Sequence, residues 1–137
     1  LKTEAWHQMI NTNLNGVYHT LMASMDALKA SKGYYITIAS LAGTNFFAQG
    51  AGYNATKFGV VGFTQAAMLD LRPHGIKVST IMPGSVSTHF NNHSPSSKDA
   101  WKIQPEDIGH LVRDLLQMHP RTLPSKIEVR PTRPDLK

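Results

Sequence analysis

Tyr53 and Lys57 are the residues whose types and spacing most directly suggest chemistry in this sequence. They stand four apart in the stretch AGYNATKFGV (51–60), and residues four apart on a helix share one face, with Cβ atoms about 5–6 Å apart. An ammonium group at that distance favours the phenolate form of tyrosine, so the phenol could serve as an acid or a base near neutral pH. The alternative is a core tyrosine beside a solvated lysine, and the pair alone does not decide between the two.

Two other polar residues precede this pair. Ser40 ends the stretch YYITIAS (34–40), where it could hydrogen-bond a substrate oxygen or simply close a strand-to-loop turn. Asn13 lies in NTNLNG (11–16), a patch of poor helix formers inside an otherwise helical pattern. A helix that tolerates such a patch usually has a local reason. Asn13 could direct a backbone group toward a buried water, or it could sit on a tolerated exposed stretch.

The stretch PGSVST (83–88) is a fourth candidate. Pro83 and Gly84 end an apolar segment sharply, so the backbone amides that follow and the Thr88 hydroxyl could approach a planar amide ligand. Taken by itself, the stretch is only a turn.

The elements that must position these residues alternate along the chain. Apolar periodicity predicts helices over 4–30, 51–71 and 105–118, with Thr3 as the first N-cap and Gly33 ending the first helix. Short β-branched runs predict strands at 34–40, 76–82 and 126–130. The polar, irregular residues 85–103 are the best candidate for a mobile loop, and the basic tail RPTRPDLK should be solvated.

This alternation predicts the fold class. Strands separated by helices pair in parallel through right-handed crossovers, and both faces of a parallel sheet must be covered. We therefore expect an α/β fold with a doubly wound parallel sheet. Three strands make a thin core, and an opening strand with a glycine-rich turn is missing, so residues 1–137 should be the second half of a larger domain.

Composition excludes several classes of function. The chain has 41% hydrophobic and 17% charged residues, which is typical of a folded domain, and no apolar run long enough to span a bilayer. It has no cysteine, which excludes disulfides and thiolate chemistry and fits a cytoplasmic protein. The net charge of +5 is dispersed, so we expect no nucleic-acid partner. His89 and His93 lack a third ligand, so we expect no metal site.

The order and spacing of the four candidate motifs carry more information than any one of them. Ser40 follows Asn13 by 27 residues, Tyr53 follows Ser40 by 13, and Pro83 follows Lys57 by 26. NTNLNG, IASLAG, YNATK and MPGSVST in this order resemble the short-chain dehydrogenase/reductase family, whose domain is Rossmann-like. The resemblance covers essentially the whole chain, which would be the C-terminal part of that single dinucleotide-binding and catalytic domain.

The resemblance implies a role for each residue. Tyr53 would exchange a proton with an alcohol or carbonyl substrate, and Lys57 would acidify it and bind the nicotinamide ribose. Ser40 would steady the substrate oxygen, and Asn13 would hold a relay water through its backbone. Tyr53, Lys57, Pro83, Gly84, Val86 and Thr88 would contact NAD or NADP, and residues 85–104 would form a substrate lid.

The same resemblance implies an activity and its partners. We expect an NAD(P)-dependent oxidoreductase acting on a small alcohol or carbonyl compound, and a homodimer or homotetramer formed through helices 4–30 and 51–71. The family's N-terminal half, with its glycine-rich dinucleotide turn, does not match any part of this sequence. The alternative is therefore a truncated or non-catalytic subunit that only binds partners. Neither the substrate nor the choice between NAD and NADP can be deduced from these residues.

Overall fold

A computed structural model describes residues 1–134, so the last three residues of the predicted tail, 135–137, lie outside the described part. The strands β1 (Tyr34–Ile38), β2 (Lys77–Pro83) and β3 (Lys126–Val129) form one sheet in the order β1-β2-β3. Both strand pairs are parallel. The predicted α/β class and parallel pairing are confirmed.

The first predicted helix is built from three segments. An α-helix, α1 (Thr3–Met9), leads through a π-helical turn at Ile10–Asn15 into α2 (Gly16–Ser31). The π-helical turn coincides with the asparagine-rich patch, so poor helix formers stand where the regular hydrogen-bond ladder changes. The predicted cap was wrong, because Thr3 is already helical and Lys2 holds the N-cap position without a side-chain hydrogen bond.

The end of α2 also differs from the prediction. Lys32, not Gly33, adopts the left-handed conformation that stops the helix (φ 49°), and its N–H donates to the Leu28 carbonyl. Gly33 follows, and its own N–H donates to the same carbonyl at 3.0 Å. The glycine therefore comes one residue too late to be the left-handed position.

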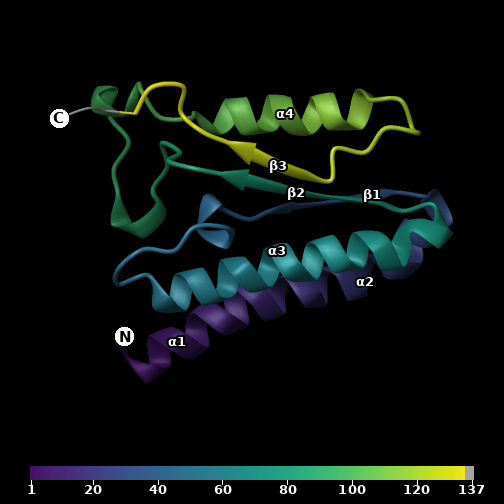
Figure 1. Cartoon of the computed structure of the whole chain (residues 1–137), viewed down its shortest axis with the longest axis horizontal. Coiled ribbons are helices and arrows are strands. Elements are labelled where there is room, and N and C mark those ends of the chain that lie inside the picture. The colour runs from purple at the N-terminus through teal and green to yellow at the C-terminus, as the bar shows by residue number, and fades with distance from the viewer. Residues whose placement is uncertain (135–137) are drawn as a thin grey trace.

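Helices cover both faces of the sheet. Figure 1 shows α1, α2 and α3 (Ala51–Leu71) below the strands and α4 (Pro105–Gln117) above them. The prediction for 51–71 matches α3 at both ends. α4 begins with Pro105 at its first position, as predicted, and a capping box between Gln104 and Asp107 supports that start. The doubly wound arrangement is confirmed.

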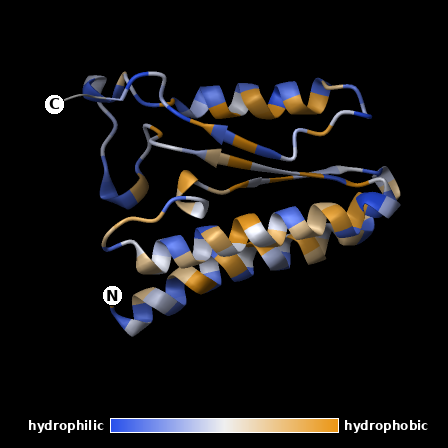
Figure 2. Ribbon diagram, viewed as in Figure 1, coloured by the Kyte–Doolittle hydropathy of each residue, from blue (hydrophilic) through white to orange (hydrophobic). Residues whose placement is uncertain are grey.

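The central strand β2 forms the middle of the core. All its residues from Val78 to Pro83 are buried, as expected for a parallel strand covered on both faces. Figure 2 shows hydrophobic residues concentrated along the strands and along α2 and α3. One apolar cluster joins Leu21, Met68 and Val78, and a second joins Val60 to Met82. The second cluster includes Ala39 and Met82, which immediately precede Ser40 and Pro83.

Candidate active site

Ser40 and Pro83 lie side by side at the carboxyl edge of the sheet. The register pairs Ile38 with Ile81, and the Ala39 N–H continues the ladder by donating to the Ile81 carbonyl at 2.7 Å. Ser40 therefore leaves β1 where Pro83 ends β2. In open parallel sheets this edge is where ligands bind. Ser40 was predicted to be the last residue of the strand, whereas it lies two residues beyond the end of β1.

The Ser40 side chain has one of its hydrogen-bonding positions already occupied. Its Oγ accepts the Ala42 N–H at 3.1 Å and caps the short 3₁₀ turn Leu41–Gly43. Because a hydroxyl accepts through its lone pairs and donates through its proton, this bond leaves the proton available. Ser40 thus performs the turn-closing role and can still donate to an oxygen in the space beside it.

Tyr53 and Lys57 occupy the first two turns of α3. The Lys57 Nζ lies 5.7 Å from the centre of the Tyr53 ring, so the cation and the phenol share one face as the spacing predicted. Burial lowers the pKa of Lys57, because the charged ammonium is partly removed from water. The phenyl ring of Phe90 packs against Tyr53 from outside the helix, with ring centres 5.6 Å apart.

Asn54 holds the loop between Ser40 and α3 in place. Its side-chain amide donates to the carbonyls of Ala42 and Asn45, both at 2.8 Å, and its Oδ1 accepts the Phe47 N–H at 3.3 Å. Asn54 is itself buried, so these bonds satisfy its side-chain amide where water has little access. Helical periodicity could have pointed to it, because Asn54 stands seven positions before the apolar Val61 and therefore on the same side of α3.

Asn13 approaches the same helix from the π-helical turn. Its amide donates to the Thr56 Oγ1 at 3.3 Å, and that hydroxyl donates to the Tyr53 carbonyl at 2.8 Å. Thr56 is fully buried. The side chain of Asn13 therefore supports the first turn of α3 through Thr56. The sequence had suggested a role only for the Asn13 backbone.

These segments surround one cavity of about 820 Å³, a volume within the usual range for ligand sites. Ser40, Tyr53, Lys57 and the turn after β2 lie together in its wall, and Asn13 does not. Among the described lining residues none is acidic, while Lys57, His93 and Lys102 are basic. The lining residues are Ile38, Ala39, Ser40, Tyr53, Lys57, Pro83, Gly84, Ser85, Val86, Thr88, Phe90, Asn91, Asn92, His93 and Lys102.

Two further findings concern residues 1–134. No cluster of three His, Asp or Glu side chains in this part of the chain has the arrangement that a metal ion would need. His93 instead contacts Asp99, with 2.6 Å between its Nε2 and the carboxylate. No helix in the same range is both long and apolar enough to cross a membrane.

The sequence reasoning missed several residues near this cavity. Lys102 lines it, and Asp99 is buried beside it and contacts both His93 and Lys102. No pattern marked them, because both lie in the irregular segment 85–104, where neither helical nor strand periodicity applies.

Known proteins resemble this chain over most of its length. A family model described as short chain dehydrogenase matches residues 1–99. An uncharacterized oxidoreductase of Staphylococcus aureus strain MW2 is 33% identical over 132 residues, which is 95% of this chain and 56% of the relative. The trans-4-hydroxycyclohexanecarboxylate dehydrogenase of Sinomonas cyclohexanicum is 39% identical over 85 residues, covering 62% of this chain and 33% of the relative. The chain thus spans about half the length of the Staphylococcus relative.

Solved structures share the fold. An alcohol dehydrogenase from the archaeon Thermococcus sibiricus, complexed with 5-hydroxy-NADP, superposes with a TM-score of 0.89 at 27% identity, covering 99% of this chain and 58% of that one. A metagenomic short-chain oxidoreductase in complex with NADP has a TM-score of 0.77 at 36% identity, covering 96% of this chain and 54% of that one.

Proposed function

The chain belongs to the short chain dehydrogenase family, and from this premise we propose that the full-length protein is an NAD(P)-dependent oxidoreductase that interconverts an alcohol and a carbonyl compound. The observation that carries the proposal is the cavity at the sheet edge, where Ser40, Tyr53 and Lys57 meet the turn after β2. Each of the three brings a group that can hold or move a proton beside a substrate oxygen.

We propose that the cavity takes the nicotinamide end of a dinucleotide together with a small substrate. Its volume of about 820 Å³ is within the range of ligand sites, and Lys57 in its wall is a cation with no ion pair to a carboxylate of the described residues. Pro83, Gly84, Val86 and Thr88 would lie against the nicotinamide, and Lys57 would hydrogen-bond the ribose hydroxyls. When bound, the dinucleotide supplies the hydride that adds to the carbonyl carbon. Relatives named for NADP support the cofactor class.

Tyr53 is the proposed proton donor. In the reducing direction its hydroxyl gives a proton to the carbonyl oxygen, so that the oxygen becomes the alcohol while the carbon receives the hydride. The Ser40 hydroxyl orients the same oxygen with the proton that its bond to Ala42 leaves free. The Lys57 ammonium favours the phenolate that Tyr53 becomes after the transfer.

Asn13 and Thr56 have a supporting place in this scheme. Their hydrogen bonds connect the π-helical turn to the Tyr53 carbonyl and fix the start of α3. We place the relay water, which would return a proton to Tyr53 by way of Lys57, next to the backbone of this turn. π-Helical turns often occur at functional sites, which supports the assignment.

The test uses purified full-length protein with NADH or NADPH and a panel of ketones, aldehydes, 3-oxoacyl thioesters and cyclic hydroxy acids. Tyr53→Phe removes only the hydroxyl and should lower kcat by at least about 100-fold, the low end for a lost general acid. The matched control, Tyr18→Phe, changes a half-exposed tyrosine of α2 and should keep full activity.

Two results would contradict the proposal. Turnover by Tyr53→Phe at the wild-type rate would remove the assigned proton donor. Absence of both turnover and any cofactor-dependent thermal shift in the wild-type full-length protein would favour the alternative, a subunit that binds partners without catalysis.

A further inference from the structure

Residues 85–104, which we call the flap, form a closed loop between β2 and α4. Its two ends are joined by a short parallel bridge between Val86 and Ile103. The Ser87 N–H donates to the Ile103 carbonyl at 2.9 Å, and the Ile103 N–H donates to the Ser85 carbonyl at 3.1 Å. The flap is therefore a loop whose ends are tied together, and side-chain contacts within it supply further order.

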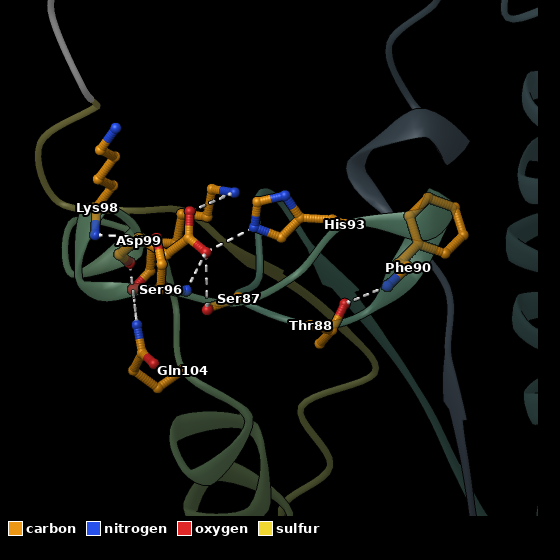
Figure 3. Close-up of polar contacts among 9 residues, drawn as sticks. Ser87, Thr88, Phe90, His93, Ser96, Lys98, Asp99 and Gln104 are labelled. Carbon is orange, nitrogen blue, oxygen red and sulfur yellow. Dashed lines mark hydrogen bonds and ion pairs between the residues drawn. The ribbon is translucent and has the colours of Figure 1, made fainter.

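A single carboxylate supplies much of that order. Asp99 is 5% exposed and accepts from four donors spread over the flap. Figure 3 shows Ser87, His93 and Ser96 converging on it. The distances to Oδ2 are 2.6 Å from His93 Nε2, 3.2 Å from the Ser96 N–H and 3.4 Å from Ser87 Oγ, and Lys102 Nζ lies 3.0 Å from Oδ1.

The electrostatics of this cluster agree with its geometry. The hydrogen bonds from His93 and then Lys102 hold the pKa of Asp99 well below its usual range. Asp99 is the only acidic residue between 85 and 104, so no other side chain of the flap could accept these protons as a carboxylate. The far end of the flap is secured as well, because the Gln104 amide donates to the carbonyls of Asp99 and Lys102.

The residues that Asp99 holds also form one wall of the cavity. His93 and Lys102 both line it, and so does Phe90, whose ring packs on Tyr53. Asn91 and Asn92, between Phe90 and His93, both have left-handed backbone angles (φ 57° and 61°). Such angles are unfavourable for residues other than glycine and persist where the surroundings determine them. The His93–Asp99 contact fixes the residue that follows them.

We propose that Asp99 is a positioning residue, whose carboxylate holds the flap against the cavity and thereby sets how tightly the substrate binds. The effect on substrate binding rests on the proposed function. The holding of the flap rests only on the contacts of the Asp99 carboxylate. Asp99 does not line the cavity, so it acts through His93, Lys102 and Phe90 rather than on the reacting atoms.

The proposal predicts a specific kinetic pattern. If only a fraction of molecules has the flap in place, the apparent dissociation constant rises by the inverse of that fraction. Asp99→Asn keeps the shape but removes the charge, and it should lower that fraction to about one tenth or less, since hydrogen bonds to charged groups are the strong ones. KM should then rise about 10-fold or more, while kcat of the bound enzyme changes by less than about 3-fold.

The experiment combines two measurements on the full-length protein. Hydrogen exchange followed by mass spectrometry reports whether amides in 85–104 lose protection, with a peptide covering 60–71 of α3 as the internal reference. Steady-state kinetics, with whichever substrate the panel identifies, reports KM and kcat. Asp114→Asn is the matched control, because this carboxylate is exposed on α4 and, among residues 1–134, its one ion pair is with its neighbour Arg113 at 3.4 Å.

The outcomes separate the two proposals. Faster exchange confined to 85–104, with a KM increase of matching size, supports the role of Asp99. Unchanged exchange in Asp99→Asn overturns it, as does a fall in kcat at constant KM. If the wild-type protein has no activity, the exchange result still decides whether Asp99 holds the flap, and only the proposed function fails.

A second variant covers the case in which Asp99→Asn does not fold. Ser87→Ala removes one buried donor to the carboxylate without touching the cavity lining. It should accelerate exchange in 85–104 and raise KM by a smaller factor, about 2- to 5-fold, as expected for one neutral donor. Exchange and KM equal to wild type in this variant would contradict the proposal.

Discussion

Lys57 is unfavourable for the stability of the fold, although the proposed reaction uses its charge. Its ammonium group is partly buried, no carboxylate lies among the described residues of the cavity, and its pKa is lowered by that burial. Such a group costs free energy in the folded state whenever it is charged. A solvated lysine would not have this cost, so the structure disfavours the packing-and-solvation alternative for the Tyr53–Lys57 pair.

Lys57→Met should therefore lower activity but not stability. Methionine keeps the length and the apolar stem and removes the buried charge, so the free energy of unfolding at pH 7 should equal or exceed that of wild type. Activity should fall by at least about 100-fold, because the phenolate of Tyr53 loses its cation. Urea unfolding and initial rates measure the two effects. A variant that is markedly less stable than wild type would contradict this account.

The pH dependence of that difference has a definite sign. Because the folded-state pKa of Lys57 lies below 10.5, the unfolded state binds more protons between the folded-state value and 10.5. Wild-type stability should therefore rise with pH across that window relative to Lys57→Met, and the advantage of the variant should shrink. Below the window both states are protonated and the difference should be constant. Unfolding curves of both proteins at several alkaline pH values measure the trend.

At the scale of elements, the turn that follows Ser40 packs closely against α3. A Cβ built on Gly43 would lie 2.5 Å from a methyl group of Val61 and 2.9 Å from the Lys57 carbonyl oxygen. The second contact is with backbone, which cannot rotate away. Glycine at this position therefore allows Ser40 to lie beside the helix that carries Tyr53.

Gly43→Ala should consequently destabilise the protein by about 1–3 kcal/mol, the usual cost of overpacking a core. Gly109→Ala is the matched control, since a Cβ on this exposed residue of α4 would meet nothing within 4 Å. Alanine is the better helix former, so the control should gain about 0.5–1 kcal/mol. Chemical unfolding of the two full-length variants compares them, and equal effects would show that the Gly43 contact is not tight.

Some of these elements and site residues could be predicted from the sequence, and others could not. The limits of α3 and the parallel order of the strands were predictable, because apolar periodicity and alternation along the chain are local signals. The spacing of Ser40 and Tyr53 along the chain predicted that they belong to one site, and both line the cavity. Asp99 was not predictable, because its four donors lie in an irregular segment and only the folded loop brings them to one carboxylate. Lys32 has the left-handed backbone angle although its neighbour is a glycine. Conformational propensity alone would predict that angle at the glycine.

At the scale of the whole molecule, α2 and α3 have more apolar surface than the sheet can cover. Phe58 and Leu69 of α3 are 43% and 54% exposed, and their spacing of 11 residues places them on nearly the same side of the helix. Tyr18 and Met22, one turn apart on α2, are 46% and 51% exposed. Large exposed apolar side chains mark an interaction surface where they form one contiguous patch. This supports a homo-oligomer formed through these helices, which stays a prediction.

Phe58→Glu tests that prediction. The full-length wild type should have the mass of a dimer or tetramer by light scattering at micromolar concentration, and a charge on this exposed face of α3 should reduce that mass. The matched control is Phe46→Glu, because Phe46 is 86% exposed in the loop before α3 and lies outside both helices. Its mass should stay that of the wild type. Since Phe58 is only partly buried, circular dichroism should show both variants folded. A monomeric wild type, or dissociation by both substitutions alike, would mean that the apolar surface of α2 and α3 has another partner.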